Sequence, residues 1–394
     1  MPINKRTFLS AGVVTAWGWG AASVFAQSRP FKIGLLLPMT GPFASTGRQI
    51  QNGVNLYLAQ FGSKVAGRQI EILLKDDTGL PDVTKRLAQE LVVNEKVDVL
   101  AGFGLTPLAL STAPIATQSR TPMVVMAAAT SSITEASPYI IRTSLTVPQV
   151  TLGVAEWAPK HDIHTAVSLV TDYGPGYDAE KTFRERFTLN GGKVLAELRV
   201  PLRNPDYAPF LQKVRDLKPD ALFVFVPAGA GIALLKQFAE RGLDKAGIKL
   251  IGEGSVADDE SLNDLGDVAL GLVTSQAYSV SHDSALNKKF VEAFMKQTKG
   301  VRPNFFGVAA YDGMHVIYNA IKATKGGVGG GDALLAAMKG QVFESPRGPI
   351  YIDAQTRDIV QNVYVRRVER INGQLYNTEI DVLKDVKDPG KTGK

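Results

Sequence analysis

The sequence contains no cysteine among its 394 residues. This absence excludes disulfide bonds, thiolate metal sites, cysteine nucleophiles and a lipid attached to an N-terminal cysteine. Histidine is also scarce, with four in the chain. His161 and His164 have the spacing of two ligands on one helix, but no third ligand lies nearby in the sequence, so a solvated helix end is the better interpretation. We therefore expect no metal site and no cofactor.

The usual signatures of catalysis and nucleotide binding are missing as well. The hydrolase pattern Gly-x-Ser-x-Gly does not occur, and Gly390-Lys391-Thr392 has Asp385 where a phosphate loop has its first glycine. Gly102-Phe103-Gly104 lacks the third glycine of a dinucleotide-binding turn. Basic residues are scattered singly rather than gathered beside aromatic ones, which argues against nucleic-acid binding.

The composition is that of an ordinary globular protein. Hydrophobic residues make up 45% and charged residues 21% of the chain, and the formal net charge is +6. These proportions exclude a disordered or collagen-like chain. The length predicts two or three compact units, and two lobes is the first expectation.

Residues 1–26 have the pattern of an export signal. Lys5 and Arg6 precede an apolar, small-residue stretch from 8 to 22, and Val24 and Ala26 are the small residues expected before a cleavage site. Cleavage after Ala26 would lower the net charge from +6 to +4. The basic pair also resembles a twin-arginine signal with lysine in the first position, so the export route stays open. We expect no membrane insertion, and the periplasm as the destination.

From residue 31 onward, β-rich runs alternate with segments of helical periodicity. The strand predicted at 31–37 is followed by a helix at 50–61, and further strand and helix pairs follow up to 143. The alternation restarts with a helix at 148–159 and continues to a strand at 248–251. Such alternation predicts two α/β units, each with a parallel sheet covered on both faces. The C-terminal third is predicted to hold helices at 284–298 and 305–323, a flexible loop at 325–332, and strands at 350–352 and 359–368 followed by a hairpin turn near Asn372-Gly373.

The loops after the predicted strands suit an anionic ligand. The segments 38–47, 102–106 and 127–131 supply hydroxyl groups, backbone amides and two phenylalanines, but no group suited to acid or base chemistry. In doubly wound sheets, ligands bind at the carboxyl ends of the strands, where the helix N-termini favour anions. Together these loops predict an anion-binding pocket.

Several segments resemble the leucine/isoleucine/valine-binding family of periplasmic solute-binding proteins. They are the stretch from Lys32 to Pro38 with Gly41-Pro42 and Gly47, then Asp76-Asp77, the Gly102 loop, Thr121-Pro122, Arg142-Thr143, Asp172-Tyr173-Gly174 and Ala310-Tyr311-Asp312. The resemblance extends from 31 to about 376. It implies the α/β fold of a type I periplasmic binding protein, with two doubly wound, Rossmann-like lobes that are joined by a three-crossing hinge and close on a ligand.

The resemblance also implies limits for the parts of the chain. Lobe 1 is expected to comprise 31–145 and 277–348, and lobe 2 to comprise 146–276 and 349–380. Residues 381–394 are expected to form a C-terminal tail. The crossings between the lobes should fall near 144–148, 274–279 and 346–353.

The family's binding residues carry over only in part. Thr106 matches the hydroxyl residue that holds the ligand carboxylate, and Ala127 and Ala129 match the backbone positions beside it, with Ala129 in place of a threonine. The two acidic positions that favour a ligand ammonium match Val147 and Gly254, so both charges are lost, although Glu253 is one residue away. A buried ammonium without a carboxylate partner is strongly disfavoured.

Aromatic residues in the strand-end loops predict flat walls for the cleft. The predicted ligand-binding residues are Phe43, Thr46, Phe103, Thr106, Ala127, Ala128, Ala129, Tyr173, Tyr177, Ala228, Glu253 and Tyr278.

The sequence therefore predicts a monomeric, non-enzymatic receptor for a small carboxylate without an amino group, with an aromatic acid favoured. The resemblance implies that an inner-membrane ABC permease receives this ligand. A receptor for branched-chain or aromatic amino acids, with Glu253 facing the ammonium, is the alternative. An exported enzyme is a more distant one.

Overall fold

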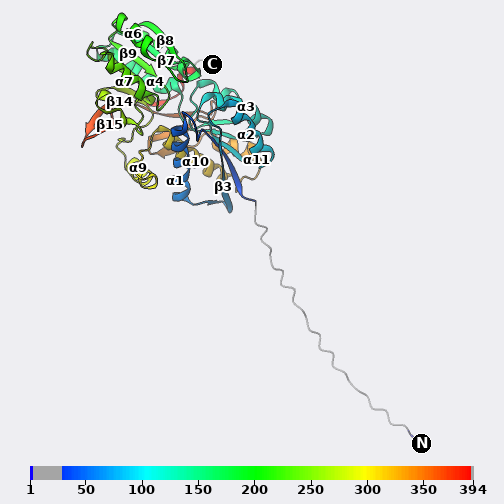
Figure 1. Ribbon diagram of the computed structural model, residues 1–394. Coiled ribbons are helices and arrows are strands. Elements are labelled where there is room, and N and C mark those ends of the chain that lie inside the picture. Colours follow the sequence, from blue (N-terminus) through cyan, green and yellow to red (C-terminus); the bar gives the residue numbers. More distant parts are fainter. Residues whose placement is uncertain (3–28, 392–394) are drawn as a thin grey trace.

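The computed structural model describes residues 1–2 and 29–391. Residues 3–26 of the predicted export signal, with its cleavage site after Ala26, lie outside the described residues. Within residues 29–391, no helix is both long and apolar enough to cross a membrane. Figure 1 shows two lobes, one built on each of two sheets.

The first lobe is built on a sheet within residues 31–142 with the strand order β2-β3-β1-β4-β5-β6, in which all neighbours are parallel except β2 and β3. Its strands are β1 (Phe31–Leu37), β2 (Lys64–Val65), β3 (Arg68–Asp76), β4 (Val99–Gly102), β5 (Met123–Val125) and β6 (Ile140–Arg142). Its helices are α1 (Ala44–Phe61), α2 (Pro81–Val93), α3 (Thr106–Ser119), η1 (Ser131–Glu135), α9 (Ala285–Thr298), α10 (Phe305–Ala323) and α11 (Gly330–Met338). Helices cover both faces of the sheet, and β1 and β4 are accordingly apolar along nearly their whole length.

The second lobe is built on a mixed sheet with the order β12-β13-β14-β11-β10-β9-β7-β8, and β15 pairs with β14. Its strands are β7 (Thr165–Thr171), β8 (Lys193–Val200), β9 (Ala221–Phe225), β10 (Lys249–Glu253), β11 (Val273–Gln276), β12 (Val342–Ser345), β13 (Gly348–Ile352), β14 (Ile359–Ile371) and β15 (Gln374–Val386). Its helices are α4 (Val147–Trp157), η2 (Ala158–His161), α5 (Gly174–Leu189), α6 (Ala208–Leu217), α7 (Gly231–Glu240), η3 (Gly254–Ala257), α8 (Leu262–Leu265) and η4 (Gly266–Ala269), and η5 (Pro389–Lys391) follows β15. The run β8-β7-β9-β10-β11 is parallel, whereas β12 to β15 are antiparallel.

A buried arginine joins the segments that pass between the lobes. Arg347 forms an ion pair of 2.7 Å with Asp312 and donates hydrogen bonds to the carbonyl oxygens of Thr143 and Ser144 and to Gln361 Oε1. Because Arg347 is about 1% exposed, removing either charge of its ion pair would leave the other unpaired in the interior.

The predicted α/β alternation is confirmed, with three local differences. The loop predicted at 325–332 ends early, because α11 starts at Gly330 and buries Leu334, Leu335 and Met338 against the first core. The crossing predicted at 274–279 begins inside β11, which pairs with β10 and β14. Residues 381–386, predicted to start a tail, instead complete β15, because the hairpin at Asn372-Gly373 brings them alongside β14.

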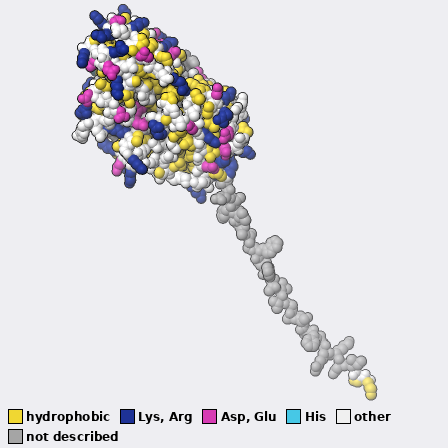
Figure 2. All heavy atoms as spheres, viewed as in Figure 1, with side chains coloured by type: hydrophobic (Ala, Val, Ile, Leu, Met, Phe, Trp, Pro, Cys, Tyr) yellow, Lys and Arg dark blue, Asp and Glu magenta, His cyan; other side chains and the backbone are white. Residues whose placement is uncertain are grey.

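Figure 2 shows lysine and arginine side chains interspersed with acidic ones over both lobes on the face in view. The charges on that face do not gather into a patch of one sign.

Candidate ligand-binding site

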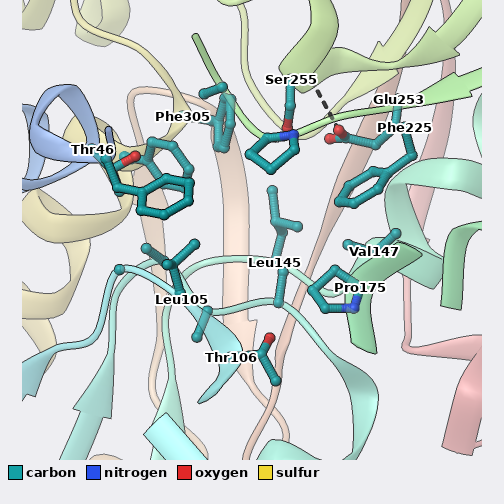
Figure 3. A pocket seen from close by; sticks show the side chains of 18 of the residues that line it. Thr46, Leu105, Thr106, Leu145, Val147, Pro175, Phe225, Glu253, Ser255 and Phe305 are labelled. Carbon is teal, nitrogen blue, oxygen red and sulfur yellow. Dashed lines mark hydrogen bonds between the residues drawn. The ribbon is translucent and has the colours of Figure 1, made fainter. Parts of the chain in front are cut away.

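A cavity lies between the lobes, at the carboxyl ends of the strands of both sheets (Figure 3). It encloses about 500 Å³, including the space open to solvent. Its lining residues come from the last residues of β9 and β10, from the loops and first helical turns that follow β1, β4, β5, β6, β7, β9 and β10, and from the first turn of α10. They are Phe43, Thr46, Gly104, Leu105, Thr106, Ala127, Ala128, Ala129, Leu145, Val147, Tyr173, Pro175, Phe225, Pro227, Ala228, Glu253, Ser255, Phe305 and Phe306. This is where doubly wound folds place their ligands.

The first-lobe wall is built around Thr106, the first residue of α3. Its Oγ1 lies 3.0 Å from Thr130 Oγ1, and its side chain is 4% exposed. The loop of three alanines after β5 is held by two backbone hydrogen bonds, from Ala128 N to Phe103 O and from Val147 N to Ala129 O. The wall therefore presents a hydroxyl group and short side chains that leave the backbone accessible to a ligand.

Helix N-termini face the cavity from both lobes. Thr46 in α1, Thr106 in α3, Val147 in α4, Pro175 in α5 and Phe305 in α10 all lie in the first turns of their helices and line it. Each N-terminus carries a partial positive charge. In α4 and α10, the caps Thr146 and Asn304 already accept from part of the first N–H groups. None of the described residues that line this cavity is lysine or arginine. The positive potential in the cavity therefore comes from the backbone.

The two lobes approach closely where α5 begins. A Cβ atom on Gly174 would lie 2.7 Å from Thr130 Oγ1 and 3.6 Å from Thr106 Cγ2. Glycine therefore allows the start of α5 to rest on the first-lobe wall.

Glu253 is the one carboxylate among the described residues that line the cavity. Ser255 N donates to its Oε2 over 2.9 Å, and Gln276 Nε2 donates to its Oε1 over 2.7 Å. Burial raises the pKa of Glu253, and the hydrogen bonds and Arg366 partly offset that effect. The carboxylate is thus held in place by two donors and keeps room to accept another.

Gly254 and Val147 replace the acidic residues that the family resemblance implies. A Cβ on Gly254 would lie 2.4 Å from Arg366 Nη2 and 2.6 Å from Gln276 Cβ, so position 254 has no room for a side chain. Val147 does line the cavity, where it contributes an apolar side chain.

Aromatic rings form much of the remaining wall. Tyr173 and Phe225 stack with ring centroids 6.2 Å apart and 29° between their planes, and the centroids of Phe305 and Phe306 lie 4.1 Å apart. Thr46 lies on the opposite side of the cavity from Phe225 in Figure 3, and Phe43 also lines the cavity. Flat apolar walls of this kind suit a planar ring.

The structure brings most of the predicted residues together at this cavity. Those that line it are Phe43, Thr46, Thr106, Ala127, Ala128, Ala129, Tyr173, Ala228 and Glu253. Their contact with a ligand stays a prediction.

Three predicted residues lie away from the cavity, and for these the prediction is corrected. Phe103 has φ +68, and this left-handed conformation turns its side chain into the apolar cluster on the other side of β4. Tyr177 is 43% exposed and donates from its hydroxyl to Asp172, because it lies almost a full turn beyond Gly174. Tyr278 is buried in an apolar cluster with Phe290 and Phe294 of α9 and donates to Asn287 Oδ1 over 3.1 Å.

Sequence reasoning missed other lining residues. Phe225 and Pro227 follow the same strand-end rule and could have been found by it. Phe305 and Phe306 could not, because α10 follows a loop after α9 rather than a strand.

Within residues 29–391, no group of three or more histidine, aspartate or glutamate side chains could hold a metal ion. The cavity offers hydrogen-bond donors, one carboxylate and apolar rings, a set suited to binding a small anion.

Direct contacts between the lobes surround the cavity. Ser45 Oγ donates to Glu260 Oε2 over 2.9 Å, and Ser131 N donates to Asp178 Oδ2 over 2.9 Å. Burial, with Asp388 nearby, raises the pKa of Asp178 to about 6. The lobes are therefore closed on the cavity.

Comparisons with known proteins agree with this architecture. The family described as periplasmic binding protein matches residues 30–374. A solute-binding protein of an ABC transporter from Rhodopseudomonas palustris BisB5, solved in complex with 3,4-dihydroxybenzoic acid, is 57% identical and has a TM-score of 0.90, with 92% of this chain and 99% of that chain covered. Another from R. palustris, solved with 4-hydroxybenzoate, is 40% identical with a TM-score of 0.89, covering 93% of this chain and 100% of that one.

A curated relative carries a different ligand in its name. The Leu/Ile/Val-binding protein homolog 6 of Brucella melitensis is 42% identical, with 94% of this chain and 95% of the relative covered.

Proposed function

This chain belongs to the periplasmic binding protein family, and we propose that it is the solute-binding receptor of an ABC importer for an aromatic carboxylate. The observation that carries the ligand class is the make-up of the cavity wall. Helix N-termini and Thr106 face it, aromatic rings flank it, and none of its described lining residues is lysine or arginine. The two R. palustris proteins that were solved with hydroxylated benzoates support the same class.

Thr106 and the alanine loop would hold the ligand carboxylate. A carboxylate accepts hydrogen bonds from hydroxyl and backbone N–H donors, and it is stabilised at helix N-termini. Thr106 Oγ1 can accept from Thr130 while donating to the ligand. Ala129 has no side-chain hydroxyl group, so its hydrogen bonds to the ligand would come from its backbone alone.

Glu253 would accept a hydrogen bond from a phenolic hydroxyl of the ligand. Its oxygens each receive one donor and retain acceptor capacity. Burial raises the pKa of Glu253, so full charges are disfavoured around it. A phenolic hydroxyl suits this site because it donates a hydrogen bond without bringing a second charge into the cavity. This role predicts a preference for hydroxylated benzoates over benzoate itself.

A receptor for branched-chain or aromatic amino acids is the second candidate. The name of the Brucella relative and the buried Glu253 favour it, since that carboxylate could face an ammonium. Against it stand Val147 and Gly254, which offer the ammonium no second carboxylate.

The remaining parts of the proposal follow from the family. The chain would be exported, act in the periplasm as a monomer and deliver its ligand to an inner-membrane permease without catalysing a reaction. Its two lobes, with β12 to β15 assigned to the second one, would open and close about the hinge at Arg347.

A thermal-shift screen of the purified protein tests this function. The panel is benzoate, 4-hydroxybenzoate, 3,4-dihydroxybenzoate, leucine and phenylalanine, with catechol as the control without a carboxylate. A ligand at about 100 times its Kd stabilises the folded state by about 2.7 kcal/mol. We expect the hydroxylated benzoates to give the largest shifts and catechol none. Largest shifts with leucine or phenylalanine would favour the second candidate, and turnover of aryl esters or amides would refute a receptor.

A further inference from the structure

A second hollow adjoins the cavity at its mouth. It encloses about 880 Å³, including the space open to solvent. Phe43, Pro227 and Ala228 line both spaces and form the partition between them. The first lobe contributes Pro42 and Phe43, and the second lobe contributes the rest of the lining: Leu202, Arg203, Asn204, Pro205, Pro227, Ala228, Gly229 and Ala230.

Arg203 supplies the one charge among the described residues that line this hollow. Its side chain is exposed, and it takes part in no ion pair within residues 29–391. Its Nη2 donates to Gly79 O on the other lobe over 3.2 Å, and its Cζ lies 5.9 Å from the centroid of the Phe43 ring. The guanidinium therefore stands beside the partition with its charge uncompensated.

The ring of Phe43 also packs against the backbone at Gly79. A Cβ on Gly79 would lie 3.2 Å from Phe43 Cδ2, so the backbone of the first lobe rests against the ring. A ligand can pass from the hollow to the cavity in two ways. Either the ring of Phe43 moves aside, or the lobes part and the hydrogen bond from Arg203 to Gly79 O breaks.

We propose that this hollow is a subsite at the mouth of the cleft, where Arg203 binds the carboxylate of an incoming aromatic acid before it passes Phe43. This inference rests on the proposed function, because it takes its ligand class from the cavity. Guanidinium groups pair with carboxylates through two parallel hydrogen bonds, and Leu202, Phe43 and Pro205 offer apolar contact to a ring.

Arg203 and the helix N-termini of the cavity attract an anion over different distances. The cavity attracts anions through helix N-termini, whose effect fades within about one turn of the helix. An exposed guanidinium acts over a longer distance, about 8–10 Å at 0.1–0.15 M ionic strength. Arg203 should therefore govern the rate of association more than the final affinity.

Stopped-flow measurement of 3,4-dihydroxybenzoate binding tests the subsite. Arg203→Met removes the charge and keeps the bulk, and Arg203→Lys keeps the charge. Arg215→Met is the matched control, since Arg215 is an exposed arginine of the same lobe whose contact is with Arg241 O. Association rates are measured from low to 0.3 M salt.

We expect Arg203→Met to slow association about 3- to 10-fold at low salt and to lose most of the salt dependence, while Arg203→Lys retains most of both. Arg215→Met should behave as wild type. An association rate of Arg203→Met equal to that of Arg215→Met would overturn the subsite. A change confined to the dissociation rate would overturn it too, because Arg203 would then act by stabilising the closed lobes. Failure of the wild-type protein to bind the acid at equilibrium would instead refute the proposed function, and this inference with it.

Discussion

Asn304 donates a hydrogen bond of 2.8 Å from its Nδ2 to Asp258 Oδ2, and this contact joins the two lobes beside the cavity. Asn304 also caps α10, because its Oδ1 accepts from Phe306 N and Gly307 N. Asp258 follows η3, in which Ser255 lines the cavity, and it is 3% exposed. The closing contact and the ligand-binding surface are thus built from the same two short segments.

Ligand affinity should fall as the pH rises from about 6.5 to 8. Burial raises the pKa of Asp258 to about 8, with Glu260 and Asp259 acting in the same direction and the hydrogen bonds from Glu260 N and Asn304 opposing them. Opening of the lobes would expose Asp258 and return its pKa toward about 4. Between about pH 4 and pH 8, lobe closure on the ligand therefore takes up a proton. The Kd should then rise by up to about tenfold per pH unit in this window and level off above it.

Calorimetric titration of Asp258→Asn checks this dependence, because the amide preserves the shape and removes the titration. Its Kd should be nearly constant from pH 6.5 to 9, while the control Asp264→Asn, at an exposed position nearby, follows wild type. Measuring above pH 6.5 keeps Asp178 largely ionised. A wild-type Kd that does not change with pH would show that closure leaves Asp258 unaffected.

Thr106→Ala should weaken binding of the aromatic acid by about 1–3 kcal/mol, because a charge-assisted hydrogen bond to the ligand carboxylate is lost in a closed site. Thr106→Ser should restore most of the affinity. Thr112→Ala is the control, since Thr112 is buried on the same helix but donates to Leu108 O. Equal affinities of Thr106→Ala and wild type in calorimetry would remove Thr106 from the ligand site.

Gly174→Ala should hold the lobes apart. The added methyl group would lie 2.7 Å from Thr130 Oγ1, closer than such atoms can approach. We expect about tenfold weaker binding, and a smaller decrease in the radius of gyration on ligand addition in solution scattering. Adding Thr130→Ala removes the clashing atom and should recover part of the loss in a double-mutant cycle. Full closure of Gly174→Ala would show that the two lobes do not meet there.

Glu253→Gln should reduce the preference for 3,4-dihydroxybenzoate over benzoate by about 5- to 10-fold, because the carboxylate acceptor becomes a weaker, partly donating amide. Benzoate, which has no hydroxyl group, serves as the internal control and should bind both proteins alike. An unchanged ratio of the two dissociation constants would exclude Glu253 as the acceptor of a ligand hydroxyl.

Local patterns predict the architecture well but side-chain direction less well. Alternating strands and helices specify where parallel strands end, so Thr106 and Ala127 could be placed at the site from their positions alone. Phe103 also follows a strand, yet its left-handed backbone turns the ring into the core, and nothing in the local sequence signals that conformation. Phe305 reaches the cavity only because α10 packs beside α1, which is a tertiary relationship.

Isothermal titration calorimetry of the wild-type protein with matched acids tests the central claim, that the cavity takes an aromatic carboxylate without an ammonium group. Phenylpyruvate and phenylalanine share ring and carboxylate, and 3,4-dihydroxybenzoate and leucine set the scale. We predict that 3,4-dihydroxybenzoate binds with one site per chain, and that phenylpyruvate binds at least about tenfold (about 1.4 kcal/mol) tighter than phenylalanine, because only the amino acid must bury a cation. Equal or tighter binding of phenylalanine, or of leucine over 3,4-dihydroxybenzoate, would contradict the account and assign Glu253 to a ligand ammonium.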